Sequence, residues 1–451
     1  MIHGTLLISD YRASRLITWG LSEEPGALGA GSADSFEGAV SGDVAETPRP
    51  GVLAEHAGFL RLPGSGPFAA AYADDRLGRL VLLDRAGRIR SEVPIAIPAE
   101  HMAVSDCGSF LAITTGCGMN MAPFSDLLTV VDLRAEVPDA VRIRVRVGEP
   151  GVALVRGDDD APYVLLRHRG EMTETGEFTG PGAVEVLPVQ EILAAGPHVP
   201  QLSGELTEEI APDGHGEVYD PVSRTVFCST GQGLERFQVR GGRPVPLGIT
   251  PWPVPGRAFY LRFEPVSRRI WCTVRGGPAD PTAWDRWTNW VMSAPVSADG
   301  EITPEVHHLP EGLAFRLDVA SGWAAGTVIS PGGDTIWIAE AENDGVRVQL
   351  GSLSPMSRPP QPGHAPWDAG PEGSAQRRAV AVLAELDAVA VTSGGDGRVE
   401  LHRRSGHGVV EQEVLDLGEV LRDSDPAPLD EGGHMIWLPA QARSEVDLIG
   451  R

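Results

Sequence analysis

The chain has 451 residues, a formal net charge of −25 and 37 basic residues, all of which are arginine. Because no basic excess is available to displace counterions from phosphates, the composition predicts neither a nucleic-acid partner nor an anionic membrane partner. The absence of lysine excludes Schiff-base chemistry on lysine and a P-loop lysine.

The first residues, Met1 to Thr5, have neither the basic region nor the apolar stretch of a signal peptide. No apolar run in the chain approaches the ~18 residues that a membrane helix needs. The four cysteines show no Cys-x-x-Cys spacing and no disulfide framework. The sequence therefore predicts a cytoplasmic protein with reduced thiols.

Short apolar runs separated by Gly, Pro, Asp and Ser clusters fill most of the chain, and this pattern predicts an all-β fold. The first two strands are expected at residues 5–9 and 15–19. The next segment, 22–50, is rich in Gly, Ala, Ser, Glu and Asp and is expected to form a surface loop. Two later segments, 353–376 and 421–433, are expected to be loop insertions of the same kind.

Three stretches of the chain look like copies of one unit. Tyr219–Cys228 and Phe263–Cys272 share a Pro-Val-Ser-Arg turn between two strand-like runs. In Ser330–Trp337, Gly and Asp suit a tight turn with positive φ, which we expect to join a first strand at 326–330 to a second at 335–339. These units resemble the repeats of YVTN-type and WD40-type β-propellers, and the resemblance implies a ring of blades.

Units of this kind begin at a spacing of roughly 40 to 65 residues, which suits propeller blades with loop insertions. Their starts lie near residues 56, 101, 150, 215, 257, 323, 378 and 434. The strands at 5–9 and 15–19 would join a last strand at 434–438 in one blade and so close the ring. We therefore expect a single domain, residues 1–451, that forms a closed β-propeller of eight blades, with seven blades as the alternative.

Four of these units have a histidine where the innermost strand of the blade would begin: His56, His101, His215 and His434. In a closed propeller, residues at this position meet around the axis. Neutral imidazole binds Fe(II), Cu and Zn, so the pattern predicts a metal site, with Mn as a further possibility. The alternative is a structural role, because Gly214-His215 and Gly433-His434 also resemble the Gly-His pair of WD40 repeats, where the histidine bonds within its own blade.

The arrangement of four axial histidines is similar to that of the carotenoid cleavage oxygenases, propellers that hold a non-haem Fe(II) in this way. The similarity is one of ligand type and topology, since the flanking motifs of that family are absent and the spacings differ. It implies that glutamates near the histidines orient the metal ligands, and the candidates are Glu55, Glu100 and Glu217.

Further residues are expected to bind a small-molecule substrate. Arg257, Trp323 and Arg378 stand at the start of other units, where the arginines could hold an anionic group. Three long loops should lie over the same face and form the walls of a pocket. Their candidate binding residues are Met119, Phe178, Trp284 and Trp287, and His168 is a candidate acid or base.

These features together predict a metal-dependent oxidoreductase that uses Fe(II) and O2 on an apolar or aromatic small molecule. One alternative is a non-enzymatic propeller that binds a protein or peptide across its face. A second is a lyase or lactonase, for which His168 would matter more than the four histidines. The oligomeric state does not follow from the sequence.

Overall fold

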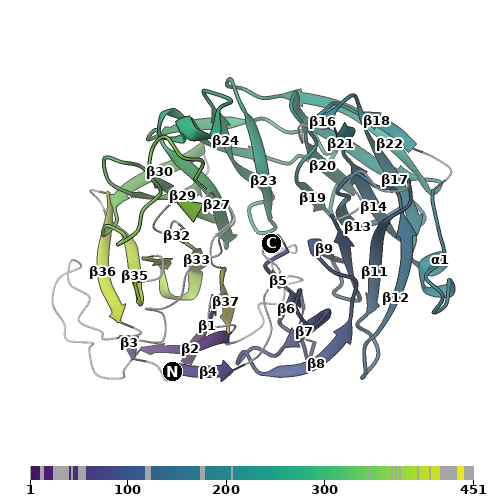
Figure 1. Ribbon diagram of the computed structural model, residues 1–451, viewed down its shortest axis with the longest axis horizontal. Coiled ribbons are helices and arrows are strands. Elements are labelled where there is room, and N and C mark those ends of the chain that lie inside the picture. Colours follow the sequence, from purple (N-terminus) through teal and green to yellow (C-terminus); the bar gives the residue numbers. More distant parts are fainter. Residues whose placement is uncertain are drawn as a thin grey trace.

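The computed structural model describes residues 2–10, 15–23, 40–41, 44–48, 57–64, 66–116, 123–172, 178–204, 207–342, 345–366, 369–370, 373–374, 377–393, 396–405, 408–416 and 434–440. In this part of the chain, eight antiparallel sheets of at least four strands are arranged around one axis (Figure 1). The fold is therefore an eight-bladed β-propeller, as the spacing of the units predicts, and the seven-bladed alternative is wrong.

Each blade runs from an innermost strand to an outermost strand, and the blades are numbered here in ring order. Blade 1 contains β37 (Met435–Pro439), β1 (Ile2–Asp10), β2 (Arg15–Glu23) and β4 (Val44–Pro48), with β3 (Val40–Ser41) beside β2. Blade 2 contains β5 (Phe59–Arg61), β6 (Ala70–Asp74), β7 (Arg79–Leu83) and β8 (Ile89–Pro94). Blade 3 contains β9 (Ala99–Val104), β10 (Phe110–Thr115), β11 (Asp126–Asp132) and β12 (Asp139–Val145). Blade 4 contains β13 (Gly151–Arg156), β14 (Pro162–His168), β17 (Gly182–Pro188) and β18 (Thr207–Ile210).

The other four blades follow the same order. Blade 5 contains β19 (Glu217–Asp220), β20 (Thr225–Ser229), β21 (Gly233–Arg240) and β22 (Arg243–Pro251). Blade 6 contains β23 (Arg257–Glu264), β24 (Arg269–Gly276), β25 (Thr288–Pro295) and β26 (Glu305–Leu309). Blade 7 contains β27 (Leu313–Ala320), β28 (Trp323–Ile329), β29 (Thr335–Glu342) and β30 (Gly345–Ser352). Blade 8 contains β33 (Val380–Leu383), β34 (Ala388–Thr392), β35 (Arg398–Ser405) and β36 (Gly408–Asp416).

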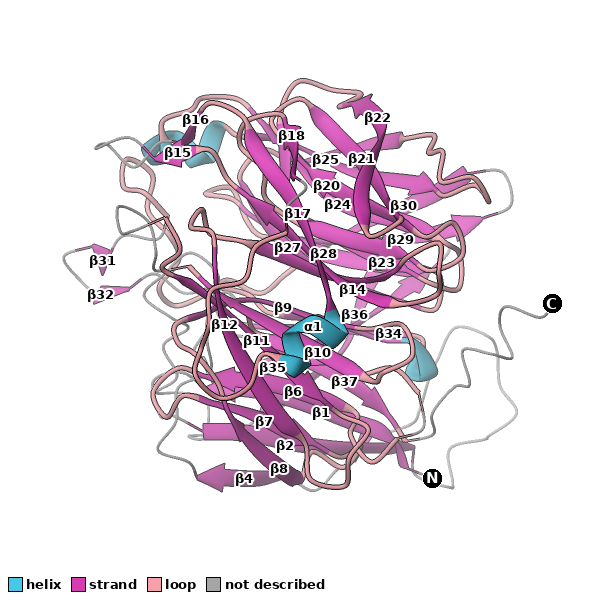
Figure 2. Ribbon diagram, turned by 90° about the vertical axis from the view of Figure 1, so that its right-hand side faces the viewer, coloured by secondary structure: helices cyan, strands magenta, loops and turns pink. Residues whose placement is uncertain are grey.

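The remaining elements are short. Two small hairpins consist of β15 (Glu171–Met172) with β16 (Phe178–Thr179), and of β31 (Ala369–Gly370) with β32 (Gly373–Ser374). The helix α1 (Val189–Ala194) lies on the outside of the ring and contacts β11 and β12 of the neighbouring blade (Figure 2). Two 3-10 turns are η1 (Pro281–Arg286) and η2 (Ala384–Leu386). In the part of the chain that the structure describes, no helix is long and apolar enough to cross a membrane.

Burial differs between the inner and outer strands of a blade, and this difference explains the sequence pattern. All six residues of β10 are buried, so a middle strand reads as one continuous apolar run. The outermost strand β22, in contrast, has one buried residue, and its other residues are half-buried or exposed without regular alternation. The outer strands therefore have the weakest sequence signal, and β3 and β4 lie within the segment 22–50 that the sequence predicts as a loop.

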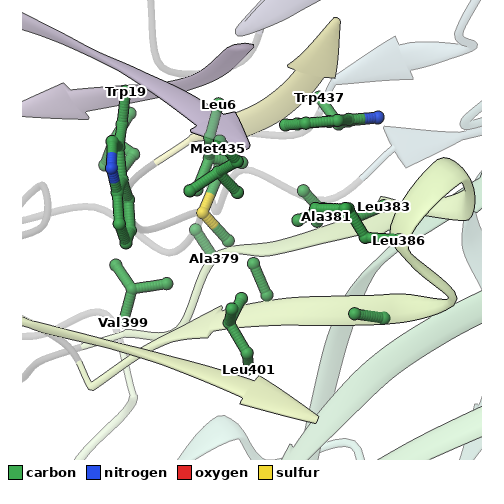
Figure 3. Close-up of a cluster of buried hydrophobic side chains, with 14 of the residues drawn as sticks. Leu6, Trp19, Ala379, Ala381, Leu383, Leu386, Val399, Leu401, Met435 and Trp437 are labelled. Atoms are coloured by element: carbon green, nitrogen blue, oxygen red, sulfur yellow. The ribbon is translucent and has the colours of Figure 1, made fainter. Parts of the chain in front are cut away.

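The two ends of the chain close the ring in blade 1. β1 pairs on one side with β2 and on the other with β37, where Leu6 is opposite Trp437. Leu6, Trp19 and Trp437 then pack against apolar side chains of blade 8 such as Leu401 (Figure 3). The innermost strands contact one another in the order β37, β5, β9, β13, β19, β23, β27 and β33, and β33 returns to β37. The shared blade is thus confirmed.

Blade 7 differs from the prediction by one strand. Its innermost strand is β27, whereas the predicted first strand at 326–330 lies in β28, the second strand of the blade. The turn at Ser330 therefore joins the second strand to the third. The Pro-Val-Ser-Arg turns do join first strands to second strands, β19 to β20 and β23 to β24. Several strands of a blade are similar apolar runs, so a turn sequence alone does not show which pair it connects.

Candidate functional site

Three of the four predicted histidines lie in the described part of the chain, at the end of the axis where the innermost strands begin. His101 is the third residue of β9, His215 stands two residues before β19, and His434 directly precedes β37. His56 and the neighbouring Glu55 lie outside the described residues.

Two of these histidines have an arginine at a ring nitrogen. Arg169 Nη2 contacts Nδ1 of His215. Arg316 Nη1 contacts Nδ1 of His434 and lies 3.0 Å from Nε2 of the same ring. A guanidinium only donates hydrogen bonds, so at both rings it occupies the lone pair of Nδ1 and leaves that nitrogen unavailable to a metal ion.

The grouping of potential ligands gives the same result. Among the residues that the structure describes, no three side chains of His, Cys, Asp or Glu are grouped so that they could hold a metal ion. The described residues therefore do not fit the axial iron centre that the similarity to carotenoid cleavage oxygenases implies.

The predicted orienting glutamates belong to a network of arginines and carboxylates. Glu217 pairs with Arg167, and their side chains are 3% and 0% exposed. Arg169 forms an ion pair of 2.5 Å with Glu149. The charges of Glu149, Arg169 and Arg167 all act on Glu100. Its burial, followed by repulsion from Glu149, raises its pKa to about 8. The carboxyl group of Glu100 is thus mainly protonated at neutral pH.

The three other residues predicted at unit starts have different places. Arg257 begins β23, pairs with Asp213 and lies with its guanidinium 4.6 Å from the centre of the Phe259 ring. Arg378 has a fully buried side chain that pairs with Asp334 at 2.8 Å, so it is a structural cation between blades 7 and 8. Trp323 begins β28, which is the second strand of blade 7, so Trp323 does not lie on an innermost strand. Its side chain is 8% exposed.

Two of the predicted loop residues, Trp284 and Trp287, are buried. Trp284 and Trp287 are 0% and 3% exposed and pack with Leu313, Ile329 and Met356, so they fill the base of their own loop. Met119 lies outside the described residues, and Phe178 begins β16. His168 is buried in blade 4 with its Nε2 3.1 Å from Glu185, and its role as an acid or base stays a prediction.

Two neighbouring innermost strands each contain a β-bulge that is not predicted above from the sequence. In β23, Phe259 and Tyr260 lie between the paired residues Ala258 and Leu261, opposite the single residue Thr273. In β27, residues 315–316 occupy the same place between the paired Ala314 and Leu317, opposite residue 327. A bulge changes the direction of side chains and is common next to binding sites. The signal was the repeated pattern Ala-Phe-x-Leu at 258–261 and 314–317.

Three arginines stand on innermost strands, Arg61, Arg262 and Arg316, and the charges of Arg316 and Arg61 both act on Arg262. We call these three residues the arginine group. Arg61 donates two hydrogen bonds, of 2.8 and 2.6 Å, to the two carboxylate oxygens of Asp318. Burial is the largest effect on the pKa of Arg61 and lowers it, but the charge and hydrogen bond of Asp318, together with the charge of Glu385, more than offset burial and raise the pKa. Arg61 is therefore a neutralised cation.

Arg262 has a different environment from Arg61. It donates a hydrogen bond of 3.0 Å to the carbonyl oxygen of Leu261, and no carboxylate in the described residues forms an ion pair with it. Burial and then the charge of Arg316 lower its pKa to about 10, with Asp318 offsetting only part of the effect. Arg262 still carries its charge at neutral pH, and its exposed surface shows that solvent reaches it.

The Arg61–Asp318 pair extends across the axis. Arg61 belongs to blade 2 and Asp318 to blade 7, so blades 8 and 1 lie between them in the ring. Arg61 also donates to the carbonyl oxygen of Trp437 in blade 1 at 3.2 Å. The backbone N–H of Val382 in blade 8 donates to Asp318 at 2.8 Å. The pair thus joins four blades beside Arg262 and Arg316.

Comparisons with known proteins identify the fold and no family. No family model matches the chain, and no curated protein matches it. The structure is similar to that of Citrobacter koseri AztD, with 12% identity, a TM-score of 0.60 and coverage of 98% of this chain and 100% of that chain. Apo AztD gives 11% identity and a TM-score of 0.59 over the same shares. The dihydro-heme d1 dehydrogenase NirN, in complex with DHE, gives 14% identity, a TM-score of 0.51 and coverage of 99% of this chain and 76% of that chain.

Proposed function

We propose that this propeller binds a small anionic molecule on its axis, with an anionic group of the ligand at the arginine group. The observation that supports this most directly is Arg262, a charged side chain on an innermost strand with no carboxylate in ion-pair contact among the described residues. Arg262 has two further cations near it, although the net charge of the whole chain is −25.

The electrostatics of the arginine group favour an anion. The charge of Arg316 and that of Arg61 both lower the pKa of Arg262, which means that the cations repel one another. A carboxylate, sulfonate or phosphate beside Arg262 would relieve this repulsion and accept two parallel hydrogen bonds from a guanidinium. Exposed surface on Arg61 and on Arg262 gives solvent access to this part of the axis.

The similarity to NirN shows the fold alone at its level of identity. NirN is described as acting on dihydro-heme d1, so one propeller of this architecture acts on an organic small molecule. A small-molecule ligand is therefore compatible with this fold, and the scaffold alternative, which binds a protein or peptide, remains a prediction.

Titration calorimetry of the full chain with citrate and with phthalate, at an ionic strength fixed by sodium chloride, tests the proposal. We expect binding to the wild type and a loss of roughly tenfold or more in affinity for Arg262→Gln, because a charged hydrogen bond is removed. Arg243→Gln, at an exposed arginine on the outer strand β22, is the matched control. Absence of binding in the wild type, or equal affinity of both variants, would overturn the proposal.

The alternative function is an iron-dependent oxidoreductase. The described residues do not group into a metal site, so this alternative depends on His56, which lies outside them. Elemental analysis of the anaerobically purified wild type beside His101→Ala separates the two. An equivalent of iron that is lost in the variant would favour the oxidoreductase. A wild type that stays free of iron after reconstitution, yet binds citrate or phthalate, would favour the anion-binding propeller.

A further inference from the structure

The bulge in β23 places two aromatic rings beside the arginine group. Phe259 and Tyr260 are consecutive, and in a regular strand their side chains would point to opposite faces. The bulge changes this alternation. His215 then meets both rings edge to face, with ring centres 4.9 Å apart for Phe259 and 6.0 Å apart for Tyr260.

Tyr260 lies next to the bulge of the neighbouring blade. β23 and β27 contact each other in the ring (Figure 1). The guanidinium of Arg316, at the bulge of β27, is 5.8 Å from the centre of the Tyr260 ring. The charge of Arg316 also lowers the pKa of Arg262 more than the charge of Arg61 does. A continuous path of side chains therefore connects the aromatic rings to the arginine group.

Phe259 and Tyr260 are less buried than two tryptophans of the same two blades, and they share their half-buried state with Phe263 and Trp290. Trp271 and Trp337 are fully buried and fill the space between strands. Phe259 and Tyr260, in contrast, are only half-buried although they stand on an innermost strand. Arg257 and Arg275 stack against Phe259 with distances of 4.6 and 4.2 Å to its ring centre, and this fixes the position of the ring.

On the basis of the function proposed above, we infer that the ligand is an aromatic or similarly planar acid. Its planar body lies against Tyr260, with Phe259 as the adjacent wall, and its anionic group reaches Arg262 and Arg316. Aromatic rings interact with one another beyond the effect of buried area, and Arg316 beside Tyr260 favours a ring on the same surface. An aliphatic acid of the same charge would reach the arginines without this contact.

A matched pair of ligands isolates the planar body. Phthalate and cis-cyclohexane-1,2-dicarboxylate carry the same two carboxylates, and only phthalate is flat. We expect calorimetry on the full chain to show phthalate binding roughly threefold to tenfold more tightly. Tyr260→Leu should abolish this preference, whereas Tyr260→Phe should keep it because the ring remains. Phe263→Leu, on the same strand beyond the bulge, is the control that should also keep it.

The outcomes separate this inference from the proposed function. Equal affinity for the two acids in the wild type would overturn the planar ligand while the anion site stands. A preference for phthalate that survives in Tyr260→Leu would overturn the assignment to Tyr260. Failure of both acids to bind the wild type would instead be a failure of the proposed function.

Discussion

At the scale of single residues, two arginines of one group show how a partner decides the state of a cation. Arg61 and Arg262 both stand on innermost strands and keep exposed surface, and the partial loss of solvent there opposes the charge of both. Asp318 pairs with Arg61 and raises its pKa, whereas Arg262 has like charges beside it and its pKa falls to about 10. Arg262 forms no ion pair with the described carboxylates, so a bound anion would be stabilised most beside Arg262.

Glu100 makes the stability of the fold depend on pH. Burial, followed by repulsion from Glu149, raises its pKa from 4.5 to about 8. Between these values the folded state holds a proton that the unfolded state has lost, so stability falls as the pH rises through this range. In Glu100→Gln the group cannot ionise. We expect the melting temperature of the wild type to fall relative to that of the variant between pH 5 and about 8.

Glu136→Gln, at an exposed glutamate of blade 3, is the control for this prediction. Its melting curve should shift in parallel with that of the wild type over the whole pH range. Parallel profiles for Glu100→Gln and the wild type would contradict the raised pKa of Glu100.

At the scale of elements, the Pro-Val-Ser-Arg turns connect neighbouring blades. Arg224 and Arg268 end the two copies, both with positive φ, at 55° and 48°. Arg224 pairs with Asp160 of blade 4 at 2.6 Å, and Arg268 pairs with Asp220 of blade 5 at 2.5 Å. Each arginine thus reaches back to the preceding blade. The near identity of the two turns follows from this shared contact.

Arg268 has a left-handed backbone conformation, so two substitutions at this residue can measure separately how the ion pair and the backbone strain affect stability. We expect Arg268→Ala to lower stability by about 1 kcal/mol, because it loses a partly exposed ion pair and keeps the positive φ. Arg268→Gly loses the same pair but relieves the strain, so its midpoint of urea unfolding should lie above that of the alanine variant. A glycine variant that is less stable than the alanine variant would contradict this account.

At the scale of the whole molecule, ring closure depends on a close approach in blade 1. A Cβ atom on Gly4 would overlap the ring of Trp437 and the carbonyl oxygen of Leu438, at the point where β1 pairs with β37. We expect Gly4→Val to open this pairing and to destabilise the fold by about 2 kcal/mol or more. Gly20→Val, in the same blade with open space around it, should have a small effect. Thermal unfolding of the two variants makes the comparison, and equal melting temperatures would contradict it.

More of the fold than of the candidate site could be predicted from the sequence. Turn residues and apolar runs are local signals, so eight units and a blade shared by both ends of the chain followed from the sequence. Blade 7 was placed one strand late because β28 is an apolar, fully buried run that looks like a first strand. The predicted position of His101, His215 and His434 near the starts of innermost strands is also a local property. Their chemistry is set by neighbours such as Arg169 and Arg316, which come from distant parts of the chain.

The sequence by itself determined an all-β ring of eight blades, because each blade is specified by residues that are close together in the chain. Only the tertiary structure decided which charges share the axis. Arg61 meets Asp318 across 257 residues of sequence, and Arg316 meets His434 across 118. No local pattern specifies such pairs, since they depend on the order and number of the blades that lie between them. The proximity of the arginine group to Phe259 and Tyr260 therefore follows only from the tertiary structure of the closed propeller.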